Sequence, residues 1–101
     1  MTITKVAEED KLTIALEGRL DTTTAPELEA FAKDELDGVA NLELDFEKLD
    51  YISSAGLRVV LSMQKVMNKQ GEMVVTKVSP EIMEIFDITG FSDILTIQEA
   101  K

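Results

Sequence analysis

The chain has 101 residues, of which 45% are hydrophobic and 30% charged, a composition typical of a soluble globular domain of common size. Its net charge of −10 disfavours nucleic acid and anionic membrane surfaces as partners and is compatible with a basic protein partner. The sequence has no histidine and no cysteine, so it lacks a Ser-His-Asp or Cys-His nucleophile and the usual zinc ligands. We therefore expect no cofactor, although carboxylates alone could still hold a metal.

Nothing in the sequence indicates membrane insertion or export. No apolar run approaches the roughly 18 residues of a transmembrane helix. The first residues, Met-Thr-Ile-Thr-Lys-Val, lack a signal-peptide pattern. The absence of cysteine is compatible with a reducing cytoplasm. We therefore expect a cytoplasmic protein that forms a single domain over residues 1–101.

Two strands are predicted at the start of the chain. Thr2 to Glu8 forms the first, with Ile3 and Val6 as its apolar anchors. After a charged turn over residues 8–11, apolar and polar residues alternate from Leu12 to Leu16, which is typical of a half-buried strand. The two strands are close enough in the sequence to pair as a hairpin.

The segment Gly18 to Thr24 is predicted to be a loop that leads into a helix. Thr24 and Glu27 have the spacing of a capping box, and Pro26 falls in the first turn. Gly38 marks the end of the helix. The apolar residues that recur at helical spacing are Leu28, Phe31, Ala32 and Leu36.

A second strand-and-helix unit occupies the middle of the chain. From Leu42 to Phe46 apolar and acidic residues alternate, as in a half-buried strand, and Leu57 to Gln70 has the pattern of an amphipathic helix. The polar side of this helix carries Arg58, Ser62, Lys65 and Lys69. The side predicted to face the core carries Leu57, Val60, Leu61, Met63, Val66 and Met67.

Between that strand and that helix lies a predicted loop, Asp50 to Gly56, with two adjacent hydroxyls, Ser53 and Ser54. The first N–H groups of a helix have no internal partner, so this position favours an oxygen or a negative charge. A serine here can cap the helix, and the same geometry can accommodate a phosphate. From the residues alone capping is the commoner role, and a capping Ser54 would lose about 1 kcal/mol on replacement by Ala.

Three more elements complete the predicted order. Met73 to Val78 is predicted to be a central strand, Ser79-Pro80 opens a helix that ends at Gly90, and Ile94 to Ile97 forms a last short strand before a frayed tail over residues 98–101. The apolar stripe of that helix is Ile82, Ile85 and Phe86. The order β-β-α-β-α-β-α-β predicts an α/β domain with a mixed five-stranded sheet whose first strand is antiparallel.

This topology predicts where a site would lie. In parallel βαβ units all strand-to-helix loops meet at one end of the sheet. The loops Gly18–Thr24, Asp50–Gly56 and Val78–Pro80 should therefore converge and form a surface for partner recognition, unless their polar residues are only helix caps and turn residues. The residues nominated for this surface are the carboxylates and hydroxyls Asp21, Thr22, Thr23, Asp50, Ser53 and Ser54, together with Gly56.

Three segments of the sequence resemble a known family. Asp50 to Leu61, which reads Asp-Tyr-Ile-Ser-Ser-Ala-Gly-Leu-Arg-Val-Val-Leu, resembles the phosphorylation-site segment of STAS domains, in particular of bacterial anti-sigma-factor antagonists. Gly18 to Ala25 resembles their other recurrent segment. The C-terminal third is similar at Gly71 to Val75, at Ser79-Pro80 and at Ile85-Phe86-Asp87. The resemblance covers nearly the whole chain and implies the STAS fold, whose layout agrees with the predicted order.

The resemblance also implies individual residues. In the family the phosphorylated hydroxyl lies two residues before the motif glycine, here Gly56, which points to Ser54. The family often has Asp immediately before the acceptor, where this chain has Ser53, so Ser53 is a second and less favoured acceptor. Ala55 stands where the family often has Ser or Thr. Asp21 matches the loop aspartate that helps to form the surface meeting the kinase.

What the family resemblance implies about function is partner switching. The unmodified protein binds an anti-sigma factor and thereby frees the sigma factor. The anti-sigma factor is also an ATP-dependent serine kinase, and phosphorylation separates the complex until a serine phosphatase resets it. The chain would be a substrate rather than an enzyme, and we expect it to be a monomer when free.

Other functions stay open at this point. The domain could be a STAS scaffold, or a soluble subunit of a sensory or membrane transport complex, without a sigma-factor cycle. The converging loops could instead hold a nucleotide or another phosphate-bearing molecule, although the chain has no Gly-rich phosphate loop. A hydrolase with Ser54 as nucleophile is the least favoured alternative, because no histidine can activate the hydroxyl.

Overall fold

The computed structural model describes residues 1–99. Its elements follow the predicted order, with one short 3-10 helix added before the last strand. In chain order they are β1 (Thr2–Glu8), β2 (Lys11–Leu20), α1 (Ala25–Glu35), β3 (Asn41–Ile52), α2 (Ser54–Gln70), β4 (Glu72–Val78), α3 (Pro80–Thr89), the 3-10 helix η1 (Phe91–Asp93) and β5 (Ile97–Glu99).

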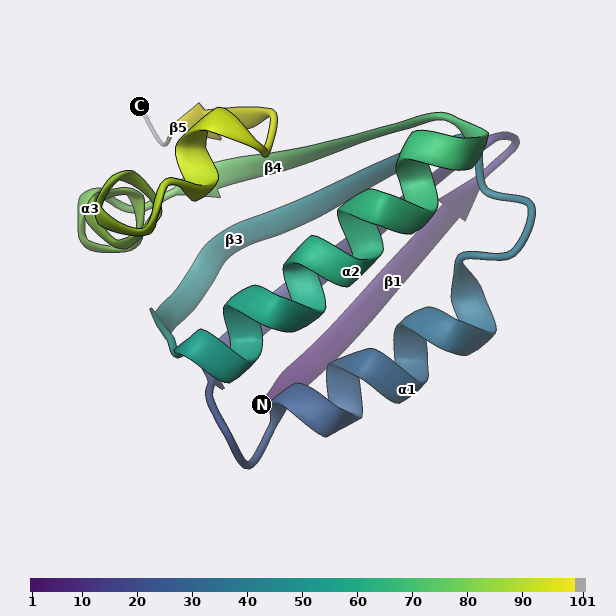
Figure 1. Ribbon diagram of the computed structural model, residues 1–101. Coiled ribbons are helices and arrows are strands. Elements are labelled where there is room, and N and C mark those ends of the chain that lie inside the picture. Colours follow the sequence, from purple (N-terminus) through teal and green to yellow (C-terminus); the bar gives the residue numbers. More distant parts are fainter. Residues whose placement is uncertain (100–101) are drawn as a thin grey trace.

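The strands form one mixed sheet in the order β1-β2-β3-β4-β5 (Figure 1). β1 and β2 are an antiparallel hairpin, and every later neighbour is parallel, which confirms the predicted sheet. The β2–β3 ladder starts at Lys11 opposite Asn41 and ends at Leu20 opposite Ile52, with two irregularities on the way. Each strand therefore pairs with the strand that precedes it in the chain.

The core lies between the sheet and the helices, with α1 and α2 covering the same face of the sheet (Figure 1). Alternate residues of β2 and β3, such as Ile14 and Leu44, are completely buried there. Met63 and Met67 of α2 are buried as predicted. α3 is joined to the same core through Phe86, whose ring centroid lies 6.4 Å from that of Phe46. No helix within residues 1–99 is long and apolar enough to cross a membrane.

The other face of the sheet is polar. The Lys11 ammonium lies 3.0 Å from a Glu43 carboxylate oxygen, and the Thr76 hydroxyl donates to Glu43 at 2.9 Å. Val6 is 52% exposed, so the prediction that it anchors β1 in the core is wrong. Successive strand residues point to opposite faces, so Ile3 and Val6, an odd number of residues apart, cannot both face the core.

Two further expectations about burial and boundaries are wrong. Val66 of α2 is 42% exposed rather than buried, since it lies beside a groove between α1 and α2. Ile94 is not in a strand, because η1 and the turn in which the Leu95 N–H donates to the Phe91 carbonyl at 2.9 Å delay β5 to Ile97. Residues 98 and 99 of the predicted frayed tail belong to β5, and residues 100–101 lie outside the described part.

Gly71 joins α2 to β4 at a point where two backbones touch. The Glu72 N–H donates to the Ala40 carbonyl at 2.9 Å. A Cβ atom on Gly71 would lie 1.8 Å from that same carbonyl oxygen. Only a residue without a side chain therefore lets the chain leave α2 and enter the sheet here.

Candidate functional site

β2 and β3 both run further than predicted and end side by side. Arg19 is paired with Tyr51 and Leu20 with Ile52, and the Ser53 N–H donates to the Leu20 carbonyl at 2.9 Å. The residues 18–20 and 50–52, expected in loops, are therefore strand. Their backbone groups find ladder partners across β2 and β3, and a hydrophobic pattern within one segment does not reveal such partners.

Gly56 keeps these two strand ends against the start of α2. It is buried, and a Cβ atom there would lie 2.7 Å from Leu20 Cγ and 2.9 Å from the Leu20 carbonyl oxygen. Gly56, nominated as part of the partner surface, thus lies beneath that surface rather than on it, where it allows the first turn of α2 to approach the end of β2.

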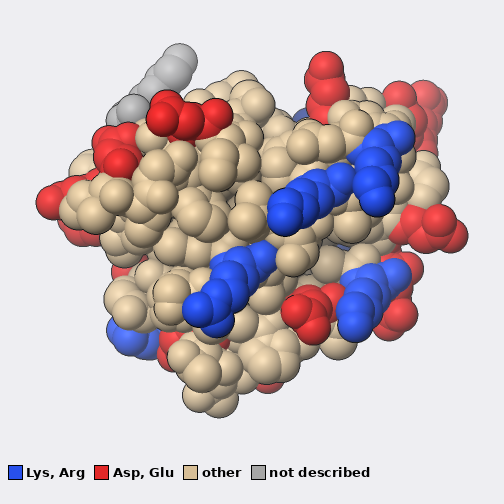
Figure 2. All heavy atoms as spheres, in the orientation of Figure 1, with Lys and Arg blue, Asp and Glu red and all other residues tan. Residues whose placement is uncertain are grey.

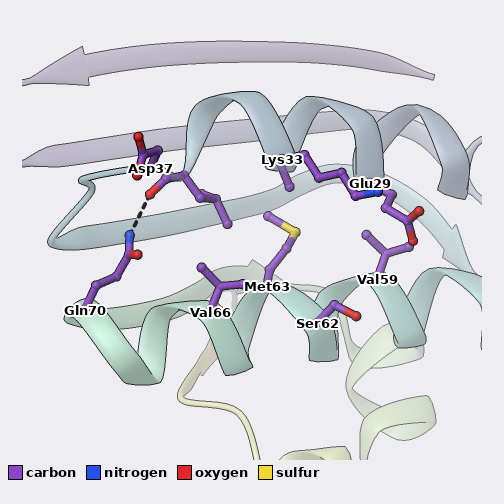
Figure 3. A pocket seen from close by; sticks show the side chains of 10 residues that line it. Glu29, Lys33, Asp37, Val59, Ser62, Met63, Val66 and Gln70 are labelled. Atoms are coloured by element: carbon purple, nitrogen blue, oxygen red, sulfur yellow. Dashed lines mark hydrogen bonds between the residues drawn. The ribbon is translucent and has the colours of Figure 1, made fainter.

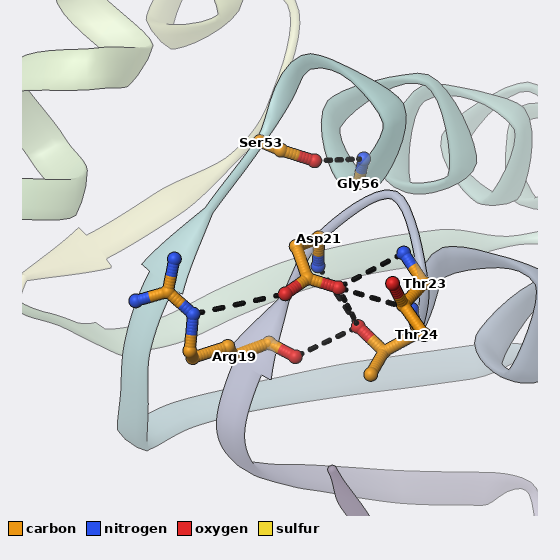
Figure 4. A network of polar contacts seen from close by, with 6 residues as sticks. All are labelled: Arg19, Asp21, Thr23, Thr24, Ser53 and Gly56. Atoms are coloured by element: carbon orange, nitrogen blue, oxygen red, sulfur yellow. Dashed lines mark hydrogen bonds and ion pairs between the residues drawn. The ribbon is translucent and has the colours of Figure 1, made fainter.

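The turn between β2 and α1 is organised by Asp21 (Figure 4). One carboxylate oxygen of Asp21 accepts the Thr23 N–H at 3.0 Å and the Thr24 N–H at 3.1 Å. The Thr24 hydroxyl donates to the Arg19 carbonyl at 2.7 Å and accepts the Asp21 N–H at 2.8 Å. Thr24 is the N-cap residue, but its side chain makes no capping bond to α1, so the expected capping box is wrong. The Thr24 hydroxyl instead forms its hydrogen bonds within the turn that precedes the helix.

The surroundings of Asp21 lower the pKa of its carboxyl. The Thr24 N–H holds the pKa of the Asp21 carboxyl below its ordinary value, with help from the Thr23 N–H, the Thr24 hydroxyl and the Arg19 cation, against the opposing effect of partial desolvation. Arg19 Nε lies 3.7 Å from the second carboxylate oxygen. A fixed negative charge therefore sits at this end of the sheet at neutral pH.

Arg19 and Tyr51 are members of the site that sequence reasoning missed. The Arg19 guanidinium carbon lies 4.3 Å from the centroid of the Tyr51 ring, a cation–π contact across β2 and β3. Both residues belong to quoted motif segments, yet their pairing follows only from the strand register, which is shifted by an irregularity between Gly18 and Arg19.

The two adjacent serines have different surroundings. Ser53 is the N-cap of α2: its backbone is extended, and its Oγ accepts the Gly56 N–H at 3.3 Å. Ser54 is the first residue of α2 and is exposed, and within residues 1–99 its hydroxyl takes part in no hydrogen bond. The interpretation of Ser54 as the cap is therefore wrong. Because β3 extends to Ile52, the non-helical cap position falls on Ser53.

The remaining nominated residues are exposed. Thr22 and Thr23 lie in the turn before α1, and Asp50 lies in the last part of β3. The third loop, Val78–Pro80, lies apart from the other two. Asp45 is the last residue of β3 that pairs with β4, and β3 continues beyond it to Ile52, whereas β4 ends at Val78. Within residues 1–99, no hydrogen bond or ion pair joins Ser79-Pro80 to the ends of β2 and β3. Polar contacts therefore unite two of the three predicted loops.

Comparisons with known proteins concern the family and the fold. The sequence model of the STAS domain family matches residues 2–100. BtrV of Bordetella bronchiseptica, a candidate anti-sigma factor antagonist, is 39% identical over 92 residues, which cover 89% of this chain and 79% of BtrV. The anti-sigma-B factor antagonist of Staphylococcus aureus is 32% identical over 84 residues, with 81% and 78% covered. Among solved structures, the Bacillus cell fate determinant SpoIIAA in its phosphorylated form shares the fold, with a TM-score of 0.74 at 19% identity and coverage of 95% and 90%.

Proposed function

This chain belongs to the STAS domain family, and we propose that it is an anti-sigma-factor antagonist that works by partner switching. The unphosphorylated form binds an anti-sigma factor with serine kinase activity in the bacterial cytoplasm and thereby frees the sigma factor. Phosphorylation of Ser54 releases the complex, and a serine phosphatase restores the first state. The free protein is a monomer, and the catalytic groups belong to its partners.

The observation that carries the proposal is the contrast between the two serines. The Ser53 hydroxyl oxygen caps α2, whereas the Ser54 hydroxyl is exposed and forms no hydrogen bond with the described residues. Ser54 Oγ would attack the γ-phosphorus of ATP, the bond to the ADP oxygen would break, and the hydroxyl proton would pass to a base of the kinase. The resulting phosphate would lie at the N-terminus of α2, which favours negative charge.

The same phosphate would oppose a docked partner. It adds about −1.5 to −2 charges at neutral pH to a surface that already holds the ionised Asp21. At an interface this charge and its bulk must be desolvated, and a loss of about 3 kcal/mol weakens binding more than a hundredfold. The switch therefore needs no large rearrangement of the domain. Asp21, Thr22, Thr23, Asp50 and Ser53 belong to the surface that the kinase recognises.

The test combines mass spectrometry with partner binding. Intact-mass and phosphopeptide analysis of protein from its native cells gives the modified residue. Pull-downs then compare Ser54→Ala and Ser54→Asp with Ser62→Ala, a matched control at an exposed serine two turns further along α2. We expect one phosphate on Ser54, and we expect Ser54→Ala, but not Ser54→Asp, to retain a kinase-like partner.

Other outcomes correct or reject the proposal. A phosphate on Ser53 would retain the switch and move the acceptor by one residue. No phosphate under any growth condition, together with identical partners for all variants, would rule out partner switching and favour the scaffold or transport-subunit role.

A further inference from the structure

The helix α2 differs in charge from the rest of the chain. It carries three basic residues, Arg58, Lys65 and Lys69, and no acidic residue. Since the net charge of the whole chain is −10, the residues outside α2 have a net charge of −13. All three are exposed. Within residues 1–99 none of them forms an ion pair, although four other cations do. On the face that Figure 2 shows, basic side chains gather along α2 and acidic ones lie mainly around the edge.

A groove runs beside this basic row, between α1 and α2. Its volume is about 510 Å³. Figure 3 shows Val59, Met63 and Val66 of α2 lining it from below and Glu29 and Lys33 of α1 from above. One end is closed by Gln70, whose side-chain N–H donates to the Val39 carbonyl at 2.8 Å.

The spacing of the lining residues indicates what shape fits the groove. Val59, Met63, Val66 and Gln70 recur at steps of four, three and four, so the apolar floor follows one side of α2 along its length. Arg58, Lys65 and Lys69, at steps of seven and four, lie on the adjacent row of the helix. A third helix laid along the groove would pack as a ridge between α1 and α2 and present its flank to the basic row.

We infer that this face of the molecule is a second docking surface, for an amphipathic acidic helix of a partner protein. Apolar side chains of that helix enter the groove beside Val66, and its carboxylates meet Lys65 and Lys69. The surface lies along the body of α2, and the inference does not depend on partner switching at Ser54.

Charge argues against the two other occupants of such a face. A flat anionic membrane would meet both sides of the groove, including the carboxylates of Glu29 and Asp37 on the α1 side, whereas a helix can place its carboxylates on the α2 side alone. A second copy docked symmetrically through α2 would bring the same three cations opposite one another. The basic residues of α2 that would repel a second copy attract an acidic helix.

Photo-crosslinking in native cells tests the inference on the full chain. Benzoylphenylalanine replaces Val66, and a matched control carries it at Val6, an exposed valine of β1. We expect irradiation to join position 66, but not position 6, to one protein, through a peptide that is acidic and helical. The charge-reversed pair Lys65→Glu and Lys69→Glu should lower the yield about tenfold. Lys48→Glu, at an exposed cation of β3 with no ion pair in the described residues, should leave it unchanged.

The remaining outcomes also support or overturn the inference. Circular dichroism checks that the charge-reversed variant stays folded, as expected for exposed positions. An unchanged yield in a Ser54→Ala background supports a surface separate from the switch, and loss of the adduct there would overturn that separation. No adduct, an adduct with lipid, with a second copy or with a basic segment, or an equal fall in Lys48→Glu, would overturn the inference itself.

Discussion

The structure makes a sharp prediction about the two serines at the start of α2. Ser53→Ala removes the oxygen that accepts the Gly56 N–H at 3.3 Å, whereas Ser54→Ala removes an exposed hydroxyl without a bond among the described residues. We therefore expect Ser53→Ala to destabilise the fold and Ser54→Ala to leave it nearly unchanged. The sequence alone suggested a loss of about 1 kcal/mol for Ser54→Ala, with Ser54 as the cap.

The magnitude follows from the capping bond. Replacing a serine N-cap by Ala typically costs about 1 kcal/mol, and the 3.3 Å length of this bond favours that value over the upper end of the range. For a chain of this size, about 1 kcal/mol lowers the melting temperature by roughly 5 °C. Ser54→Ala should stay within about 0.5 kcal/mol, as do most surface substitutions. Ser53→Gly should recover most of the loss, because glycine is tolerated at N-caps.

Urea unfolding followed by circular dichroism measures these differences. Ser79→Ala is the positive control, since Ser79 caps α3 through the Ile82 N–H, also at 3.3 Å. Equal losses for Ser53→Ala and Ser54→Ala would refute the assignment of the cap. So would a full loss for Ser79→Ala combined with none for Ser53→Ala.

Three other expectations concern the site turn, the α2–β4 junction and the core. Because the folded state lowers the pKa of Asp21 below its ordinary 3.8, its stabilising effect exists above that pH and is lost as the pH falls through the folded value. The difference in urea midpoint between the wild type and Asp21→Asn should therefore be largest near neutral pH and shrink below pH 3.8. Gly71→Ala should cost about 3 kcal/mol in the same assay, because its Cβ would lie 1.8 Å from the Ala40 carbonyl oxygen, and a loss under about 0.5 kcal/mol would contradict that contact. Phe86→Ala should cost about 3–5 kcal/mol in thermal unfolding, while Ile88→Ala, 76% exposed on the same helix, should cost almost nothing, and similar losses would show that α3 is wrongly placed.

The core was predictable where one periodicity holds over a whole element. Alternation placed Leu44 and Phe46 inside, and helical spacing placed Met63 there, since each pattern has one face that must leave water. Prediction failed where burial depends on a neighbour. Val66 fits the apolar stripe of α2, yet it lines the groove between α1 and α2 and is 42% exposed.

The candidate site was predictable in position but not in detail. The motif spacing located the serine pair before Gly56, and topology brought it near Asp21. Which serine caps α2 depends on where β3 stops, and that is set by pairing with a strand that lies some thirty residues earlier in the chain. A single segment carries no record of such pairing, so the cap was placed on Ser54 instead of Ser53.

The strands have the same order in the sheet as in the chain, and this bears on how the protein folds during synthesis. On the ribosome, strands emerge in the sequence β1 to β5, and each pairs with the one that emerged before it. No strand has to be inserted between two that are already joined, so the sheet can grow at its newest edge during synthesis. The edge of β2 is the first that must wait for a partner beyond a helix, because α1 and the start of β3 must first be translated. We expect this interval, when Ile14 and its neighbours have no cover, to be the point at which a nascent chain most needs a chaperone.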